Sequence, residues 1–147
     1  MERVMNELKL KVKAICIFQQ RDYIFVSKSF DSVEKEDYYR PIGGTTEFGE
    51  YSKETIIREI HEEMNAEIDN IELMKVIENI FVCDGRNGHE IVFLYRADFV
   101  DKAHYEMIEH QISESNGRKY PAYWIKIDDF SMGNLRLVPE GLIEYLK

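Results

Sequence analysis

The residues best suited to chemistry in this sequence are four glutamates and one arginine that follow a glycine-rich segment. The stretch that contains both the glycines and these charged residues runs from Gly44 to Ala66 and reads GTTEFGEYSKETIIREIHEEMNA. Hard divalent cations such as Mg²⁺ take oxygen ligands, typically one or two carboxylates together with substrate phosphates and water. Carboxylates at fixed spacing beside a glycine-rich backbone therefore predict a metal-dependent enzyme. The five charged residues are Glu50, Arg58, Glu59, Glu62 and Glu63.

The second half of this segment has the periodicity of an amphipathic helix. Ser52 is a suitable N-cap, Glu54 places a carboxylate in the first turn, and the helix is expected to end near Met64. The apolar side chains recur within a stripe about 100° wide, which is typical of a helix packed on a core. The stripe consists of Ile56, Ile57, Ile60 and Met64.

Glu59, Glu62 and Glu63 fall in a different sector of the same helical wheel. Glutamates three and four residues apart repel each other, and the C-terminal half of a helix disfavours negative charge. A bound cation would reverse both effects, whereas the simpler interpretation is a solvated acidic face. Arg58 lies four residues before Glu62 and could also reach back to Glu50, which favours a brace that orients the acidic face.

The glycines before the helix suggest a loop in which the backbone can approach a ligand closely. Gly43 and Gly44 follow Pro41 and Ile42, so we expect a strand end followed by a tight turn. A glycine pair alone indicates little more than a turn. Its combination with the charged helix is more informative than either feature alone.

The whole pattern resembles the Nudix box, the signature of the Nudix hydrolases. Asn65 stands where this family usually has glycine, and Asn is the next most tolerant residue for a left-handed backbone at a helix end, so the helix end should be preserved. The matching residues are Gly44, Glu50, Arg58, Glu59, Ile60, Glu62, Glu63 and Ala66.

The resemblance implies a fold and a reaction. The fold is α/β, an α/β/α sandwich with a mixed β-sheet and a loop-helix-loop catalytic motif, expected here as a single domain over 1–147. The reaction is hydrolysis of a diphosphate linkage in a nucleoside diphosphate joined to another moiety, by attack of water on phosphorus with Mg²⁺ or Mn²⁺ as cofactor. Position by position, the resemblance implies that the metal ligands are Glu59, Glu62, Glu63 and Gly44. It implies catalytic roles for Glu59, Glu62 and Arg58. Gly43 and Glu50 are expected to support these residues from outside the metal-ligand set.

The general base remains open at the level of sequence. Glu59 is the first candidate, and the base can also come from a loop outside the box. The segment 104–116 is expected to be such a loop and carries Glu106, Glu109 and Glu114. Three aromatic residues, Tyr39, Phe48 and Phe81, are candidates for stacking on a substrate, although aromatic residues at strand positions more often belong to the core.

Substrate choice is only weakly constrained. In the Nudix family, ADP-ribose hydrolases tend to carry a proline some 15 to 18 residues beyond the box, and dinucleoside polyphosphate hydrolases tend to carry a tyrosine there. Here residues 80–84 read IFVCD, so neither residue is present. A nucleoside triphosphate or an oxidised nucleotide is therefore slightly favoured. The alternatives are an ADP-ribose, nucleotide-sugar or dinucleoside polyphosphate hydrolase, or a non-catalytic Nudix-fold sensor. Because all four box glutamates are retained, an enzyme is favoured over a sensor.

Composition limits the partners. The net charge of −9 argues against binding to duplex nucleic acid, which requires lysine and arginine contacts to phosphate, but permits a nucleotide held through a cation. No signal-like or membrane-spanning apolar run is found, so a cytoplasmic protein without membrane contact is expected. Cys16 and Cys83 lie in apolar runs and read as small buried hydrophobes rather than a disulfide. A homodimer is common in the Nudix family.

Alternating apolar patterns predict the strands that surround the helix. Residues 8–18 form a strand whose expected hairpin partner is 23–27, and residues 37–42 lead into the glycines. Two long strands at 71–82 and 90–99 are separated by a turn cluster at 84–88. A further strand is expected at 122–127 and a short terminal helix at 139–147.

Overall fold

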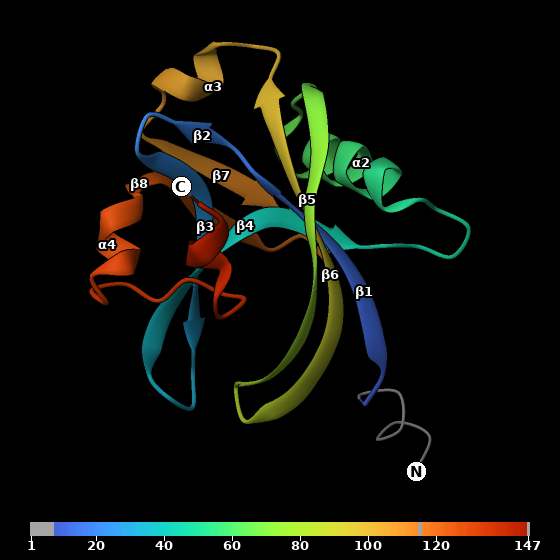
Figure 1. Ribbon diagram of the computed structural model, residues 1–147, viewed down its shortest axis with the longest axis vertical. Coiled ribbons are helices and arrows are strands. Elements are labelled where there is room, and N and C mark those ends of the chain that lie inside the picture. The colour runs from blue at the N-terminus through green and yellow to red at the C-terminus, as the bar shows by residue number, and fades with distance from the viewer. Residues whose placement is uncertain (1–7, 115, 147) are drawn as a thin grey trace.

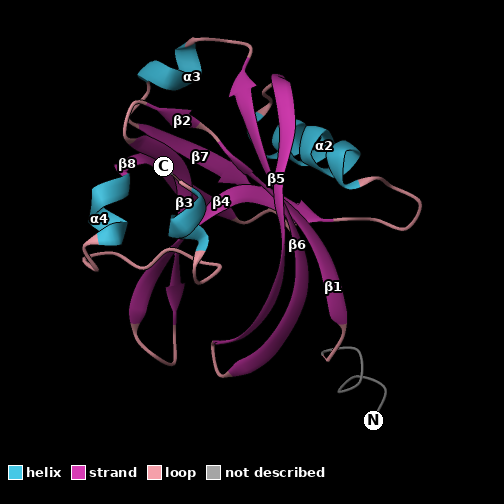
Figure 2. Cartoon of the chain, in the orientation of Figure 1, coloured by secondary structure: helices cyan, strands magenta, loops and turns pink. Residues whose placement is uncertain are grey.

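The protein folds into a bent mixed β-sheet with helices on both sides. The computed structural model describes residues 8–114 and 116–146. The strands follow the order β5-β6-β1-β4-β3-β8-β7, and the short β2 pairs with β3 (Figures 1 and 2). The strands are β1 (Leu10–Ile17), β2 (Gln19–Gln20), β3 (Tyr23–Asp31), β4 (Glu36–Thr45), β5 (Ile68–Cys83), β6 (Arg86–Phe99), β7 (Glu109–Ser113) and β8 (Lys119–Lys126). The helices are α2 (Ser52–Met64), α3 (Ala103–Glu106), α4 (Ile127–Ser131) and the 3₁₀ turn η1 (Leu142–Tyr145).

The pairing of β1 differs from the sequence expectation. β1 lies parallel to β6 and antiparallel to β4, so it does not form a hairpin with β3. Only the turn before residue 23 was predicted correctly. It connects the short strand β2 with β3, and the two strands pair through Gln20 and Tyr23. Residues 14–18 are buried on both faces of the sheet, and such a strand is most stable between two neighbours. The parallel pairing of β1 and β6 confirms the expected mixed sheet.

Two apolar clusters cover the two faces of the sheet. On one face, Ile56 and Ile60 of α2 pack with aromatic residues that include Phe25 and Phe99. On the other face, Phe130 of α4 and Leu142 of η1 pack on strand residues such as Leu94. This arrangement confirms the predicted α/β class with helices on both sides of the sheet.

Helix α2 ends as predicted but begins one residue differently. It ends at Met64, and Asn65 adopts the left-handed conformation with φ of 52°. The N-cap is Tyr51 rather than Ser52, and the Glu54 carboxylate accepts the Tyr51 backbone N–H at 2.9 Å. Ser52 is instead the first helical residue, and its hydroxyl pairs with the hydroxyl of Tyr95 at 2.6 Å.

The buried face of α2 is more polar than its periodicity predicted. Ile57 is 46% exposed, so its assignment to the apolar stripe is wrong. Thr55 and Glu63 are buried instead. The buried residues of α2 are therefore 55, 56, 60 and 63, about one position to the side of the predicted stripe.

Other predicted boundaries also change. Gly43 and Gly44 lie inside β4 instead of in a loop, and the expected loop 104–116 contains β7. The 84–88 turn is confined to Asp84 and Gly85, because Cys83 already pairs with Arg86. The predicted terminal helix is only the 3₁₀ turn η1. Among the described residues, no helix has the length and apolar character needed to cross a membrane.

Candidate active site

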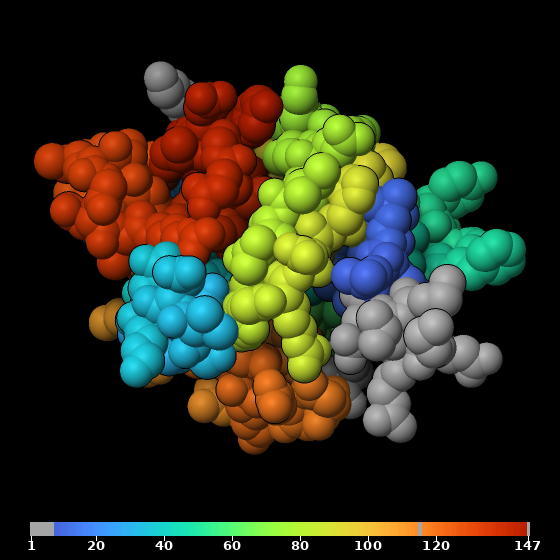
Figure 3. Space-filling model, turned by 90° about the horizontal axis from the view of Figure 1, so that it is seen from below, coloured from blue at the N-terminus to red at the C-terminus, as the bar shows by residue number. Residues whose placement is uncertain are grey.

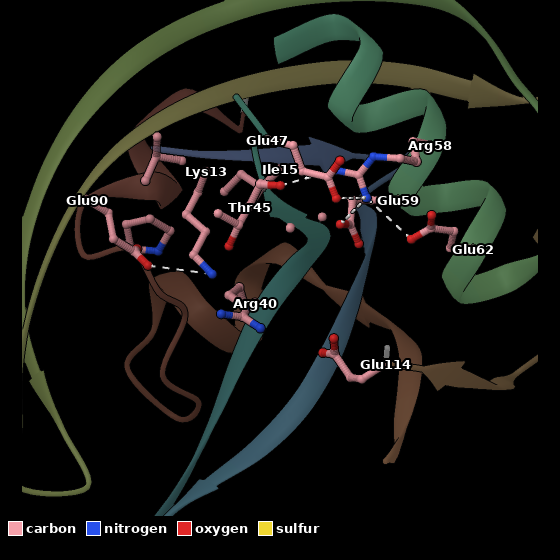
Figure 4. Close-up of a pocket in the computed structure, with 14 residues that line it drawn as sticks. Lys13, Ile15, Arg40, Thr45, Glu47, Arg58, Glu59, Glu62, Glu90 and Glu114 are labelled. Atoms are coloured by element: carbon pink, nitrogen blue, oxygen red, sulfur yellow. Dashed lines mark hydrogen bonds and ion pairs between the residues drawn. The ribbon is translucent and has the colours of Figure 1, made fainter. Parts of the chain in front are cut away.

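A cavity of about 320 Å³ opens where α2 faces β1 and β4. Its helix side presents the carboxylates of Glu59 and Glu62 (Figure 4). Its opposite side presents the cations of Lys13 and Arg40 together with the carboxylate of Glu90, which pairs with Lys13. Glu114, which follows β7, reaches the cavity from a third direction. The segments that meet here lie far apart in the sequence, so the cavity is formed only by the tertiary fold.

Arg58 connects the loop before α2 with the helix carboxylates. Its Nε donates to Glu50 Oε2 at 2.7 Å and its Nη2 donates to Glu50 Oε1 at 3.0 Å, which is a bidentate pair. Its Nη1 donates to Glu59 Oε1 at 2.8 Å and to Glu62 Oε2 at 3.3 Å. The brace expected from the sequence is therefore present as a set of hydrogen bonds, and it fixes the direction of both cavity carboxylates.

Glu50 is held in its charged form by this contact. The hydrogen bonds from Arg58 lower the pKa of Glu50 to about 2, although partial burial acts in the opposite direction. Thr55 Oγ1 at 2.7 Å and the Glu47 backbone N–H at 3.1 Å also donate to its carboxylate. Glu50 thus anchors the loop and Arg58 while its own side chain stays outside the cavity lining.

The two glycines of β4 have different spatial roles. A Cβ at Gly43 would collide with the backbone of Ala14 in the neighbouring strand. A Cβ at Gly44 would collide with the carboxylate of Glu59. Gly43 therefore permits the strand pairing, and Gly44 leaves the room in which the Glu59 carboxylate lies against the β4 backbone.

Glu63 is the least expected member of the site, because it is buried rather than turned towards solvent. Its Oε1 has no hydrogen-bond partner among the described residues. Burial, a hydrogen bond with Glu59 and the nearby charge of Glu114 raise the pKa of Glu63 to about 9. An isolated carboxylate is costly to bury unless a cation or a donor compensates it.

These carboxylates fit a divalent cation in their chemistry. The buried oxygen of Glu63 lacks a partner, and Glu59 lies beside it, so oxygen ligands for a hard cation are gathered at one place. Within 8–114 and 116–146, no three acidic, histidine or cysteine side chains are already arranged as a metal-ligand set. In the structure, the positive charge that pairs with Glu59 and Glu62 is the guanidinium of Arg58.

The cationic side of the cavity was not identified from the sequence. Lys13 Nζ lies 4.0 Å from Glu90 Oε2, and both side chains are mostly buried. Burial and the charge of Arg40 lower the pKa of Lys13. The available sequence signal was a lysine within an apolar strand, two positions before Ile15, where a charge needs a partner or a ligand. Lys13 and Arg40 together suit the phosphates of an anionic ligand.

The three glutamates considered as alternative bases separate in space. Glu114 lines the cavity. Glu106 lies in α3, and Glu109 begins β7 opposite Tyr123, so neither lines the cavity. The structure thus brings only one of the three close to Glu59 and Glu63.

The three aromatic residues considered for substrate stacking lie in different environments. Tyr39 is only 7% exposed and packs edge-on against Phe130 in the core, so its position does not suit ligand stacking. Phe48 is fully exposed and lines no described cavity. Phe81 lines a smaller hollow next to the main cavity.

A mixed sheet that holds a carboxylate-bearing helix opposite two cations defines a protein class suited to charged phosphate ligands. Residues 8–146 match the NUDIX domain family, and the chain therefore belongs to the Nudix family. It is accordingly a Nudix pyrophosphohydrolase, and enzymes of this family generally use divalent metal ions.

Solved structures agree with this fold. A NUDIX hydrolase from Nitrosomonas europaea has a TM-score of 0.63 at 15% identity, with 93% of this chain and 86% of that chain covered. A mutator MutT protein from Bacillus halodurans has a TM-score of 0.56 at 19% identity, with 88% and 76% covered. A MutT NUDIX hydrolase from Burkholderia pseudomallei has a TM-score of 0.55 at 18% identity, with 83% and 87% covered. No curated protein matches the chain significantly.

Proposed function

We propose that the protein is a divalent-metal-dependent hydrolase that cleaves the diphosphate linkage of a nucleoside diphosphate joined to another moiety. The observation that carries this proposal is the division of the cavity, with Glu59 and Glu62 on one side and Lys13 and Arg40 on the other. A diphosphate is anionic at both phosphorus atoms, so it needs positive charge along its whole length. The cationic side can bind phosphate directly, and the acidic side requires a cation between itself and phosphate.

Glu59, Glu62 and Glu63, with the backbone at Gly44, are the residues that would hold Mg²⁺ or Mn²⁺. When bound, such an ion polarises phosphate oxygens and lowers the pKa of its bound water. Arg58 orients Glu59 and Glu62 through its hydrogen bonds. Lys13 and Arg40 bind the phosphate oxygens and stabilise the charge that develops on them in the transition state.

The attacking water needs a base close to the metal-binding carboxylates. Glu59 and Glu114 are the two candidates that line the cavity. Glu114 is the more available of the two, because Glu59 is already the acceptor of the Arg58 hydrogen bond. A proton acceptor outside the metal-ligand set can take the proton from water directly.

For the substrate, a nucleoside triphosphate or an oxidised nucleotide is slightly favoured over ADP-ribose, nucleotide sugars and dinucleoside polyphosphates. A sensor that binds a nucleotide without cleaving it is the second candidate. Retention of Glu50, Glu59, Glu62 and Glu63 together with an intact Arg58 brace favours the enzyme. We expect the ligand to be a small molecule, and a homodimer is compatible with the proposal.

The test is a product-resolved hydrolysis panel with Mg²⁺ and with Mn²⁺. The panel contains unmodified and oxidised nucleoside triphosphates, ADP-ribose, nucleotide sugars and dinucleoside polyphosphates. Cleavage that depends on the metal and is lost in Glu59→Gln, but retained in the matched exposed control Glu67→Gln, supports the proposal. Absence of cleavage by folded protein that binds Mn²⁺ would favour the sensor.

A further inference from the structure

The loop that connects β4 with α2, residues 46–51, projects from the body of the molecule and is seen in blue-green at the right of Figure 3. Apolar packing does not hold this loop in place, because its two large apolar side chains, Phe48 and Tyr51, are exposed. Glu47 of the loop nevertheless lines the main cavity, and Glu50 holds Arg58. The position of the loop therefore depends on polar contacts at its base.

Thr55 lies at the centre of these polar contacts. It is the fourth residue of α2, and its side chain is completely buried. Its Oγ1 lies 2.7 Å from Glu50 Oε1, 3.0 Å from Thr46 Oγ1 and 3.3 Å from the backbone oxygen of Tyr51. One hydroxyl group is thus within hydrogen-bond distance of both ends of the loop.

The single proton of this hydroxyl is donated to Glu50. A threonine in a helix often donates to the carbonyl four residues earlier, which belongs to Tyr51 here, but this contact is the longest of the three. The Glu50 carboxylate is the nearest acceptor, and it is charged, which makes the hydrogen bond stronger. The hydroxyl of Thr46 is then left to donate to Thr55 Oγ1, because a hydroxyl oxygen can accept hydrogen bonds while it donates one.

The contact with Thr55 fixes the plane of the Glu50 carboxylate. Both oxygens of this carboxylate pair with Arg58, at 2.7 and 3.0 Å, so the planar guanidinium must follow any rotation of the carboxylate. The remaining guanidinium nitrogen, Nη1, donates to Glu59 at 2.8 Å. The Thr55 hydroxyl therefore acts on the direction of Glu59 through two intervening side chains.

Burial alone does not account for the hydroxyl of Thr55. Valine has nearly the same shape and would fill this buried position without a polar atom. Glu50 would still accept hydrogen bonds from Arg58 and from the Glu47 backbone N–H, so its charge would remain paired. The hydroxyl is thus not needed for packing, and its shortest contact is with the brace of the catalytic helix.

We propose that Thr55 is a positioning residue of the reaction, whose hydroxyl fixes the brace of Glu50 and Arg58 and thereby orients Glu59. This inference rests on the proposed function, because it takes metal binding and hydrolysis as the purpose of the oriented Glu59. Thr55 does not line the main cavity, so it acts through Glu50 rather than on a ligand.

Thr55→Val and Thr55→Ser form a matched pair that tests this role. The first variant removes the hydroxyl and keeps the shape, whereas the second keeps the hydroxyl and removes the methyl group. Loss of a residue that orients a metal ligand from outside the ligand set typically weakens metal affinity or activity about 10–100-fold. We expect Thr55→Val to weaken Mn²⁺ binding about tenfold, measured by calorimetry without substrate, and to lower kcat with little change in KM. Thr55→Ser should match the wild type in both measurements.

Acid unfolding reports the hydrogen bond itself, independently of metal and substrate. Hydrogen bonds from Arg58, opposed by partial burial, and from Thr55 and the Glu47 backbone lower the pKa of Glu50 to about 2. Without the Thr55 hydroxyl, this pKa should rise towards its ordinary value of 4.5, so the stability contributed by charged Glu50 should be lost at a higher pH as the solution is acidified. Urea unfolding at several acid pH values should show this shift in Thr55→Val and not in Thr55→Ser.

Two results would overturn the proposal. The first is wild-type Mn²⁺ affinity and kcat, or wild-type acid unfolding, in Thr55→Val. The second is an equal loss in Thr55→Val and Thr55→Ser, because this would indicate packing of the methyl group. If Thr55→Val does not fold, Thr55→Ala is the second variant without a hydroxyl and is compared with Thr55→Ser in the same way.

Failure of the positioning role can be distinguished from failure of the proposed function. If the wild type cleaves nothing in the hydrolysis panel, but Thr55→Val alone weakens Mn²⁺ binding and shifts acid unfolding, the positioning role stands and the proposed catalytic function fails. If the wild type cleaves a substrate and Thr55→Val cleaves it equally well, the proposed function stands and the role of Thr55 fails.

Discussion

The carboxylate of Glu59 lies so close to Gly44 that a side chain at residue 44 would have to displace it. The adjacent Gly43 faces the backbone of Ala14 instead. Two neighbouring glycines of one strand therefore serve different purposes, since one permits strand pairing and the other provides space for a functional carboxylate.

Substitution of the two glycines should separate stability from activity. In Gly44→Ala the Glu59 side chain can rotate away, so the fold should survive, and turnover should fall about 100-fold because misplacing a reacting group by about 1 Å has an effect of that size. Gly43→Ala should mainly lower the melting temperature, because the backbone of Ala14 cannot move as easily. Thermal melts and turnover for both variants check this, and equal losses of activity at equal stability would contradict it.

The helix carboxylates should be needed for metal binding rather than for folding. Glu62 is exposed, so its ion pair with Arg58 contributes little stability and its like-charged neighbours contribute none. Glu62→Gln should therefore leave the free energy of unfolding within about 0.5 kcal/mol of wild type, as is usual for surface substitutions. Its Mn²⁺ affinity, measured by calorimetry without substrate, should fall at least tenfold. An unchanged Mn²⁺ affinity would remove Glu62 from the metal site.

Glu50 should make stability depend on pH in the acid range. Its pKa is lowered to about 2 in the folded protein from an ordinary value of 4.5, so the charged form contributes stability above pH 4.5, and this contribution is lost as the pH falls towards 2. Glu50→Gln should destabilise the protein by about 2 kcal/mol at pH 7, the usual size for a lost hydrogen bond to a charged group. Urea unfolding at several pH values should show the gap between variant and wild type closing below pH 4.5. A gap independent of pH would mean that charge is not the cause.

Glu114 should be needed for the rate of the chemical step if it is the general base. Glu114→Gln should lower kcat with little effect on KM, because the base acts mainly in the transition state. Glu106→Gln and Glu109→Gln are matched controls from the same stretch of sequence, and neither residue lines the cavity. A wild-type kcat in Glu114→Gln would assign the base to Glu59.

Much of the site could be predicted from the spacing of residues close together in the sequence. The end of α2 at Met64, the left-handed Asn65 and the contact between Arg58 and Glu50 depend on residues within one helix and its adjoining loop. Helical periodicity fixes which of these side chains lie on the same side, so the sequence alone was sufficient to predict them.

Only the tertiary structure decided which other residues reach the site. Lys13 and Arg40 come from strands whose pairing depends on long-range contacts, and β1 was expected to pair with β3 instead of β6. Periodicity placed Glu63 with the exposed carboxylates, but the packing of α2 on the sheet buries it. The sequence by itself thus determined the family, the catalytic helix and its brace, because these follow from short-range geometry. The positions of Lys13 and Arg40, the burial of Glu63 and the hollow lined by Phe81 depend on how distant segments pack, which no local pattern encodes.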